Sequence, residues 1–122
     1  MFDVLNILAA AVTAGLGVYG LLLPHKAAQL VRLEATGLEG RSEFRASFGG
    51  LWIGLGVVPL ATMEPMVFAM AGIVWLTTAL GRLISFAFDE TLSRQNIINI
   101  GFEVACGGLL LLGAPFTTLA SL

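Results

Sequence analysis

Four long stretches of this chain contain no charged residue, and they constrain its fold more than any other feature. Lys, Arg, Asp and Glu are absent from residues 4–25, 46–63, 65–81 and 104–122. Each stretch is close to the ~20 apolar residues that cross a ~30 Å hydrocarbon layer as a helix. Charged residues make up 11% of the chain, against roughly 25% in an ordinary soluble domain, so a water-soluble surface is excluded. The sequence predicts an integral membrane protein whose first partner is the lipid bilayer.

The predicted fold is all-α, an integral membrane four-helix bundle that forms one transmembrane domain over residues 1–122. The helices are expected at about 4–23, 44–60, 65–86 and 96–112. Pro24 stops the first helix, and Pro65 suits the first turn of the third. The second and third helices are joined by a very short connection, so they must be antiparallel neighbours.

The connection after the first helix is expected to contain a short interfacial helix. In residues 24–34 the polar and the apolar side chains occupy different helical arcs, which is typical of a helix in the headgroup layer. Residues 37–40 then supply the turn into the second spanning helix. The basic residues lie in or beside the first and third connections, and Lys and Arg mark the cytoplasmic side. Both termini are therefore predicted to be non-cytoplasmic.

Small residues recur at four-residue spacing, which allows close helix packing in lipid. The second helix offers Ala46, Gly50 and Gly54, and the third offers Thr77 and Gly81. Packing within one bundle is the favoured interpretation, and a homodimer face is the alternative.

The second and fourth helices share a local pattern. Residues 44–51 align without a gap over residues 102–109, and residues 13–17 align more faintly over 77–81. The matches indicate two duplicated helical hairpins, with coincidence between glycine-rich helices as an equal alternative. Arg45 and Glu103 occupy equivalent positions, as expected if the two halves pair.

Three ionisable residues interrupt the predicted helices and form the candidate site, namely Arg45, Arg82 and Glu103. A charge at mid-bilayer costs about 2.5–3.5 kcal/mol, so such residues usually pair or line a cavity. Asn99 lies one helical turn before Glu103, on the same face. The predicted intramembrane polar cluster consists of Arg45, Arg82, Asn99 and Glu103, with Glu43 and Asp89 at its rim.

The cluster has three interpretations. It is an ion-pair clasp that sets helix register, or Glu103 is a proton-coupling or cation-binding carboxylate, or the two arginines bind an anion. An enzyme is not expected, since there is no nucleophile–base pair. With one cysteine, Cys106, and one histidine, His25, neither a metal nor another cofactor is expected. The scattered basic residues do not form a surface for nucleic acid.

Two functional hypotheses follow from this pattern. The first is a non-catalytic accessory or assembly subunit of a larger membrane complex, with a membrane-protein partner or a homo-oligomer. The alternative is a small oligomeric transporter or channel that uses Glu103 as its coupling carboxylate. A weaker idea, lipid or quinone binding near Trp52 and Trp75, rests only on aromatic content.

Several short motifs resemble a known family. They are Ser42-Glu43-Phe44-Arg45-Ala46 followed by Gly49-Gly50, then Gly81-Arg82 with Ser85 and Asp89, then Glu103. These motifs are similar to a bacterial family of small four-helix integral membrane proteins of unknown function, related to the DoxX-like membrane proteins. The resemblance spans nearly the whole chain. It implies a bacterial inner (cytoplasmic) membrane location and a recurring set of Arg45, Arg82 and Glu103, without an activity. A glycine often follows the aspartate in that family, where this chain has Glu90.

Overall fold

The computed structural model describes residues 3–122, and these residues form helices and connections without a β-strand. This confirms the all-α prediction for the described residues. Met1 and Phe2, which begin the predicted domain, lie outside them. The chain divides into two compact units. One unit is Ala10–Ala61, and the other combines the segment that ends at Ala9 with Thr62–Leu122.

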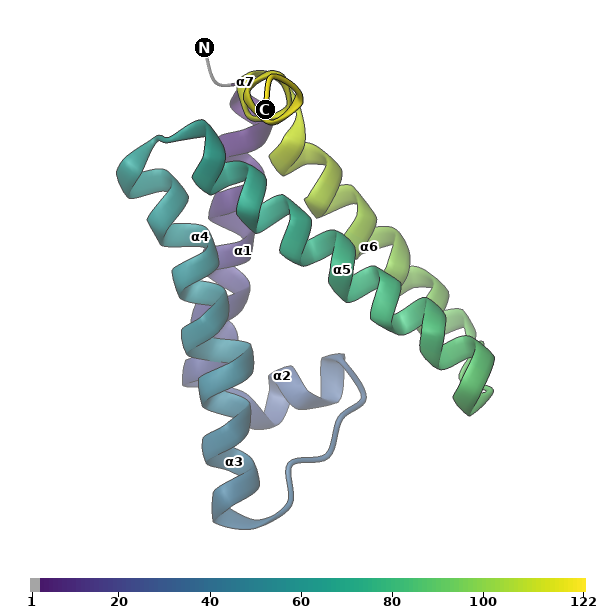
Figure 1. The fold of residues 1–122 in the computed structure, drawn as a ribbon. Helices are drawn as coiled ribbons and strands as arrows, with labels where there is room; N and C mark the ends of the chain where they lie inside the picture. Colours follow the sequence, from purple (N-terminus) through teal and green to yellow (C-terminus); the bar gives the residue numbers. More distant parts are fainter. Residues whose placement is uncertain (1–2) are drawn as a thin grey trace. The chain divides into compact units, whose positions relative to one another are not determined.

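The unit Ala10–Ala61 contains the larger part of α1 and all elements up to α4 (Figure 1). These elements are α1 (Val4–Leu22), α2 (Pro24–Leu30), α3 (Gly37–Arg45), the π-helical turn η1 (Ala46–Gly50) and α4 (Leu51–Thr62). The last three continue as one helix of 26 residues.

The second long helix therefore begins seven residues before its predicted start. Residues 37–40, which were expected to form a turn, are its first helical turn, and Glu39 there suits the positive end of the helix dipole. The apolar stretch indicated only the part of this helix without charges. A charged first turn can still be helical, so the apolar pattern was a poor guide to the helix start. The expected interfacial helix exists as α2, but it ends at Leu30 rather than near residue 34.

Glycines bring α1 into backbone contact with η1 and α4. A Cβ atom at Gly17 would lie 2.8 Å from the carbonyl oxygen of Gly49, and one at Gly56 would lie 2.7 Å from the Cα of Ala14. Neither position has room for a side chain. Backbone contact of this kind is how helices pack in lipid, where burial of apolar surface between helices contributes little.

The small residues predicted to form the packing face do not take part in these close approaches. A Cβ atom at Gly50, Gly54 or Gly81 would meet no atom of the described chain within 4 Å, and both Ala46 and Thr77 are exposed. A four-residue spacing selects one face of a helix without indicating which neighbour meets it, so the predicted packing face stays a prediction. The π-helical turn adds to the difficulty, since it rotates the residues that follow it.

The other unit is built around a hairpin of α5 (Pro65–Asp89) and α6 (Arg94–Leu111), which lie side by side (Figure 1). Gly72 and Gly107 face each other, because a Cβ atom at either would lie 2.9 Å from the carbonyl oxygen of the other. Phe68, Trp75 and Leu110 are buried beside them. Ser93 begins α6 as its N-cap, accepting a hydrogen bond from the backbone N–H of Asn96 at 3.2 Å.

The chain bends by 77° after α6 and continues as a short helix, α7 (Ala114–Ala120), that was not predicted. Gly113 makes the bend with a φ of +68°, and Pro115 lies in the first turn of α7. The sequence of Gly113 and Pro115 had indicated only the end of a helix. Pro at this position fits a helix start equally well.

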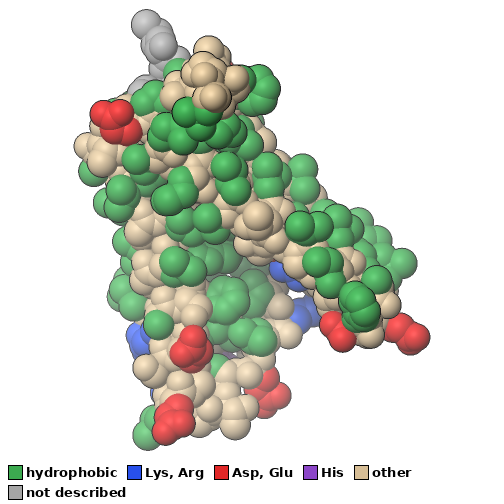
Figure 2. All heavy atoms as spheres, in the orientation of Figure 1, with side chains coloured by type: hydrophobic (Ala, Val, Ile, Leu, Met, Phe, Trp, Pro, Cys, Tyr) green, Lys and Arg blue, Asp and Glu red, His purple; other side chains and the backbone are tan. Residues whose placement is uncertain are grey.

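Three helices are long and apolar enough to cross a membrane, namely Val4–Leu22, Gly37–Thr62 and Pro65–Asp89, and the bent pair α6–α7 would supply a fourth span if it counts as one. Hydrophobic side chains cover much of the visible surface along α5, and acidic side chains lie at the end of this helix (Figure 2). Many large apolar residues of α5 are exposed to the surroundings, among them Met70, Leu80 and Leu83. Membrane-spanning helices are therefore supported by length, composition and surface.

Candidate functional site

The most polar contact between α5 and α6 is the ion pair of Arg82 and Glu103. Nε and Nη2 of Arg82 donate to Oε1 and Oε2 of Glu103 at 2.9 and 2.8 Å. The side chain of Glu103 is 6% exposed and that of Arg82 is 28% exposed. Two parallel hydrogen bonds between a guanidinium and a carboxylate form the geometrically most specific type of ion pair. Both carboxylate oxygens of Glu103 therefore have a charged partner.

The same guanidinium connects this pair to the start of α6. Nη1 of Arg82 donates to Oδ1 of Asn96 at 3.0 Å, and Nδ2 of Asn96 donates to the carbonyl oxygen of Thr91 at 2.7 Å. Arg82 thus uses all three of its terminal groups within the hairpin. Its contacts join the last third of α5 to two turns of α6, and Asn96 extends them to the α5–α6 connection.

A second set of hydrogen bonds continues toward the connection. Ser85 donates to Oδ2 of Asp89 at 2.9 Å, and its hydroxyl lies 3.0 Å from the hydroxyl of Thr91. Asp89, predicted at the rim of the cluster, is bound within its own helix. The network therefore extends from the buried Glu103 to the exposed end of α5.

Asn99, the predicted amide of the cluster, is bound elsewhere. It accepts a hydrogen bond from Nε2 of Gln95 at 3.0 Å, whereas the amide that contacts Arg82 belongs to Asn96. The i, i+4 spacing had favoured Asn99 because it places that amide on the same face of α6 as Glu103. The amide that reaches Arg82 lies at the start of α6. The available signal was Ser93, which caps the helix and so marks where α6 begins.

Arg45 and Glu43 belong to the unit Ala10–Ala61, and their predicted association with Arg82 and Glu103 stays a prediction. Within that unit, Nη1 of Arg45 donates to the carbonyl oxygen of Leu21 near the end of α1. Glu43 accepts a hydrogen bond from Ser47 at 3.1 Å.

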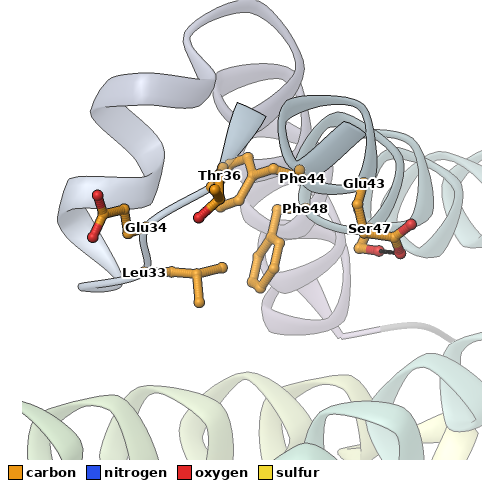
Figure 3. A pocket seen from close by; sticks show the side chains of 9 residues that line it. Leu33, Glu34, Thr36, Glu43, Phe44, Ser47 and Phe48 are labelled. Carbon is orange, nitrogen blue, oxygen red and sulfur yellow. Dashed lines mark hydrogen bonds between the residues drawn. The ribbon is translucent and has the colours of Figure 1, made fainter. Parts of the chain in front are cut away.

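Glu43 also lies at an open pocket of about 260 Å³ beside α3 and η1. Leu33 and Phe48 point toward its centre, and the carboxylates of Glu34 and Glu43 lie on opposite sides (Figure 3). Phe48 stacks on Phe44 with ring centroids 4.6 Å apart. The pocket is thus an aromatic surface with acidic edges, formed within one unit.

Asn6 is a buried polar residue that sequence reasoning missed. It is 0% exposed, and its Nδ2 donates to the carbonyl oxygens of Leu109 at 2.6 Å and Leu112 at 2.8 Å. Its Oδ1 accepts from the backbone N–H of Asp3 at 2.9 Å. These carbonyls lie where α6 ends and the chain bends, so Asn6 satisfies backbone groups that the bend leaves without helical partners. An uncharged amide inside the first apolar stretch was the available signal.

Arg82, Asn96 and Glu103 are joined by hydrogen bonds into one network within the described residues. The described residues contain no group of three or more His, Cys, Asp or Glu side chains placed to hold a metal ion. Trp75 packs edge-on against Phe102 at 5.7 Å, and Trp52 lies 5.7 Å from Phe48, so both indoles take part in packing between aromatic rings.

Comparison with known proteins gives one positive result. No curated protein and no solved structure matches the chain. A family model described as Domain of unknown function (DUF4345) matches residues 1–114. This match covers nearly the whole chain, including α1, the α5–α6 hairpin and both residues of the ion pair. The chain therefore belongs to the DUF4345 family of unknown function.

Proposed function

We propose that this protein is a non-catalytic accessory or assembly subunit of a larger membrane complex. The observation that carries the proposal is the bidentate contact of Arg82 with Glu103. A carboxylate that couples ion movement must exchange its proton or cation, and both oxygens of Glu103 already accept hydrogen bonds from one guanidinium. Glu103, a buried carboxylate of the hairpin, is thus already paired with Arg82.

The surface of the helices supports the proposal of a partner. Gly50, Gly54 and Gly81 have open space where a Cβ atom would be, and large apolar side chains such as Leu51 and Leu80 are exposed beside them. Small residues on an apolar helix face allow a second helix to approach closely in lipid. The proposed partner is therefore a different membrane protein that packs on these faces, and a second copy of the chain is the alternative that the test below distinguishes.

Native mass spectrometry of membranes extracted without detergent tests this proposal. We expect the chain to leave the membrane with a different protein at a fixed stoichiometry. Gly54→Leu should reduce that complex, because a bulky side chain would occupy the open face. Val57→Leu is the matched control on the same helix, since Val57 is exposed and already carries a branched side chain, and it should leave the complex intact. A chain that is released only as a monomer or as a homo-oligomer would contradict the accessory role.

The alternative is a small oligomeric transporter or channel with Glu103 as its coupling carboxylate. Burial of this carboxylate within a helix hairpin supports it. The test is proton flux into liposomes that contain the purified chain, measured with an enclosed pH dye. The accessory role predicts no flux above that of empty liposomes. Flux that Glu103→Gln abolishes without changing the helix content would favour the transporter.

We also propose a four-helix bundle in a bacterial inner membrane, with both termini outside the cytoplasm. The support is the bias of Lys and Arg toward the first and third connections. Glu64, in the turn between α4 and α5, is exposed and suits a cysteine substitution. In a Cys106→Ala background, Glu64→Cys should react with an impermeant thiol reagent added from the non-cytoplasmic side. Reaction only from the cytoplasmic side would reverse the proposed orientation.

A further inference from the structure

An open pocket of about 330 Å³ lies where α1 ends, between the start of α2 and one face of α3. Its apolar part is formed by Leu22, Leu23 and Pro24. Its polar part is formed by His25, Lys26, Arg41 and Arg45, so two elements far apart in sequence contribute cations to one cavity. Every charged residue at this pocket is basic. This arrangement favours an anionic ligand with an apolar portion.

The cations of this pocket are available to a ligand. Lys26, Arg41 and Arg45 are exposed, and none of them forms an ion pair with any residue in the described range 3–122. Arg45 is held in place by the hydrogen bond from its Nη1 to the carbonyl oxygen of Leu21. A guanidinium has five N–H donors, so this bond positions Arg45 and leaves donors for a ligand. Arg41 lies one helical turn from Arg45 on the same face of α3.

The pocket also lies at the depth of lipid headgroups if the long helices cross a membrane. The helix Gly37–Thr62 has 26 residues and spans about 39 Å at 1.5 Å per residue, which is longer than a ~30 Å hydrocarbon layer. Its first turns, which carry Arg41, therefore extend beyond the hydrocarbon. The helix α1 ends at Leu22, in the same pocket. Phosphate groups of the lipids lie at this boundary.

We propose that this pocket binds the phosphate headgroup of an anionic phospholipid. Lys26, Arg41 and Arg45 supply the charge and the hydrogen-bond donors for the phosphate, and Leu22 and Leu23 contact the first carbons of the lipid chains. Leu22 and Leu23 are 65% and 47% exposed, and a free phosphate would leave both in contact with water. Basic pockets beside spanning helices commonly recognise anionic headgroups. The inference is independent of the accessory role, because a transporter could carry the same site.

Lipid retention by the purified full-length chain tests this site. The chain in a neutral detergent is titrated with phosphatidylglycerol, with phosphatidylcholine and with inorganic phosphate, and bound molecules are counted by native mass spectrometry. We expect preferential retention of one phosphatidylglycerol. Lys26→Gln and Arg41→Gln should each weaken its binding about fivefold, the effect of removing one basic residue near an anionic surface. Both residues are exposed, so either variant remains informative if the other folds poorly.

Arg32→Gln is the matched control. Arg32 lies in the same connection and is exposed, but it does not line the pocket. We expect it to change phosphatidylglycerol binding less than twofold. Equal losses for Arg32→Gln and Arg41→Gln would overturn the proposal, since they would indicate diffuse attraction to the whole connection. Equal retention of phosphatidylcholine, or equally tight binding of inorganic phosphate, would also overturn it.

Discussion

The side chain of Asn6 supplies hydrogen-bond donors to backbone carbonyls at the end of α6. The carbonyl oxygens of Leu109 and Leu112 lie next to the bend at Gly113, and Asn6 donates to both from a fully buried position. A buried carbonyl without a donor costs about 1–3 kcal/mol. The amide of Asn6 therefore connects the first turns of α1 to the end of α6 through two hydrogen bonds.

Replacing Asn6 with the nearly isosteric leucine should lower the free energy of unfolding by about 1–3 kcal/mol, because the carbonyl oxygens of Leu109 and Leu112 lose the donor that the buried amide supplies. Asn99→Leu is the matched control, since the side chain of Asn99 is part-buried and, within residues 3–122, is hydrogen-bonded only to the side chain of Gln95. It should cost clearly less. The measurement is unfolding in mixed micelles of a mild detergent and SDS, followed by circular dichroism. Equal losses for the two variants would contradict the role of Asn6.

Glu90 is a second residue whose importance is local. It ends α5 in the left-handed region, with a φ of 54° and a ψ of 43°, a conformation that favours glycine. This explains why glycine suits the position after Asp89. The resemblance to a family with glycine there contained that signal, but the sequence of this chain alone did not.

We predict that Glu90→Gly raises the free energy of unfolding by up to about 1 kcal/mol, since it removes the cost of a left-handed Cβ-bearing residue. Asp89→Gly, one position earlier and inside the helix, should lower it by about 1 kcal/mol. Chemical unfolding of the two variants under identical micelle conditions gives the comparison. A loss of stability in Glu90→Gly would mean that its carboxylate matters more than its backbone.

At the scale of the elements, the sequence predicted which segments are helical better than how they meet. Apolar stretches identify helices because the backbone must satisfy its own hydrogen bonds in lipid. They do not specify the face of contact, and the close approaches occur at Gly56 and Gly107 rather than at Gly54 and Gly81. The Arg82–Glu103 contact was easier to anticipate, because few residues inside apolar helices can satisfy a charge. The bend before α7 and the amide of Asn6 required knowledge of the backbone path.

Neighbouring glycines allow a sharp test of the helix contacts. A Cβ atom at Gly107 would lie 2.7 Å from Cγ of Leu76, whereas one at Gly108 would meet no described atom within 4 Å. Gly107→Ala should therefore force α5 and α6 apart and cost about 1–3 kcal/mol. Gly108→Ala should be neutral or stabilising by up to about 1 kcal/mol, because alanine is the better helix former.

The same comparison is available in the unit Ala10–Ala61. Gly56→Ala should be destabilising because it places a Cβ atom against the backbone of Ala14, and Gly54→Ala should be tolerated. SDS unfolding of the four alanine variants separates the two outcomes. If Gly54→Ala and Gly108→Ala are as harmful as their neighbours, the helices meet on different faces from those described.

At the scale of the whole molecule, stability in a membrane must come from few contacts. Burial of apolar surface between helices contributes little in lipid, so close backbone packing and polar contacts between helices carry more of the free energy. In the unit that holds α5 and α6, the contact with the most hydrogen bonds between charged groups is that of Arg82 with Glu103. We propose that this pair is a structural clasp and not a site where ions are exchanged.

A double-mutant cycle, which measures the coupling energy between Arg82 and Glu103, tests this proposal most directly. The free energy of unfolding is determined in bicelles for the natural chain, Arg82→Gln, Glu103→Gln and the double variant. Each single substitution should cost about 1.5–3 kcal/mol, because it leaves a charged group without its hydrogen-bond partner. The double variant should lose much less than the sum, with a coupling energy of at least about 1 kcal/mol. Additive effects, with a coupling energy near zero, would contradict the clasp.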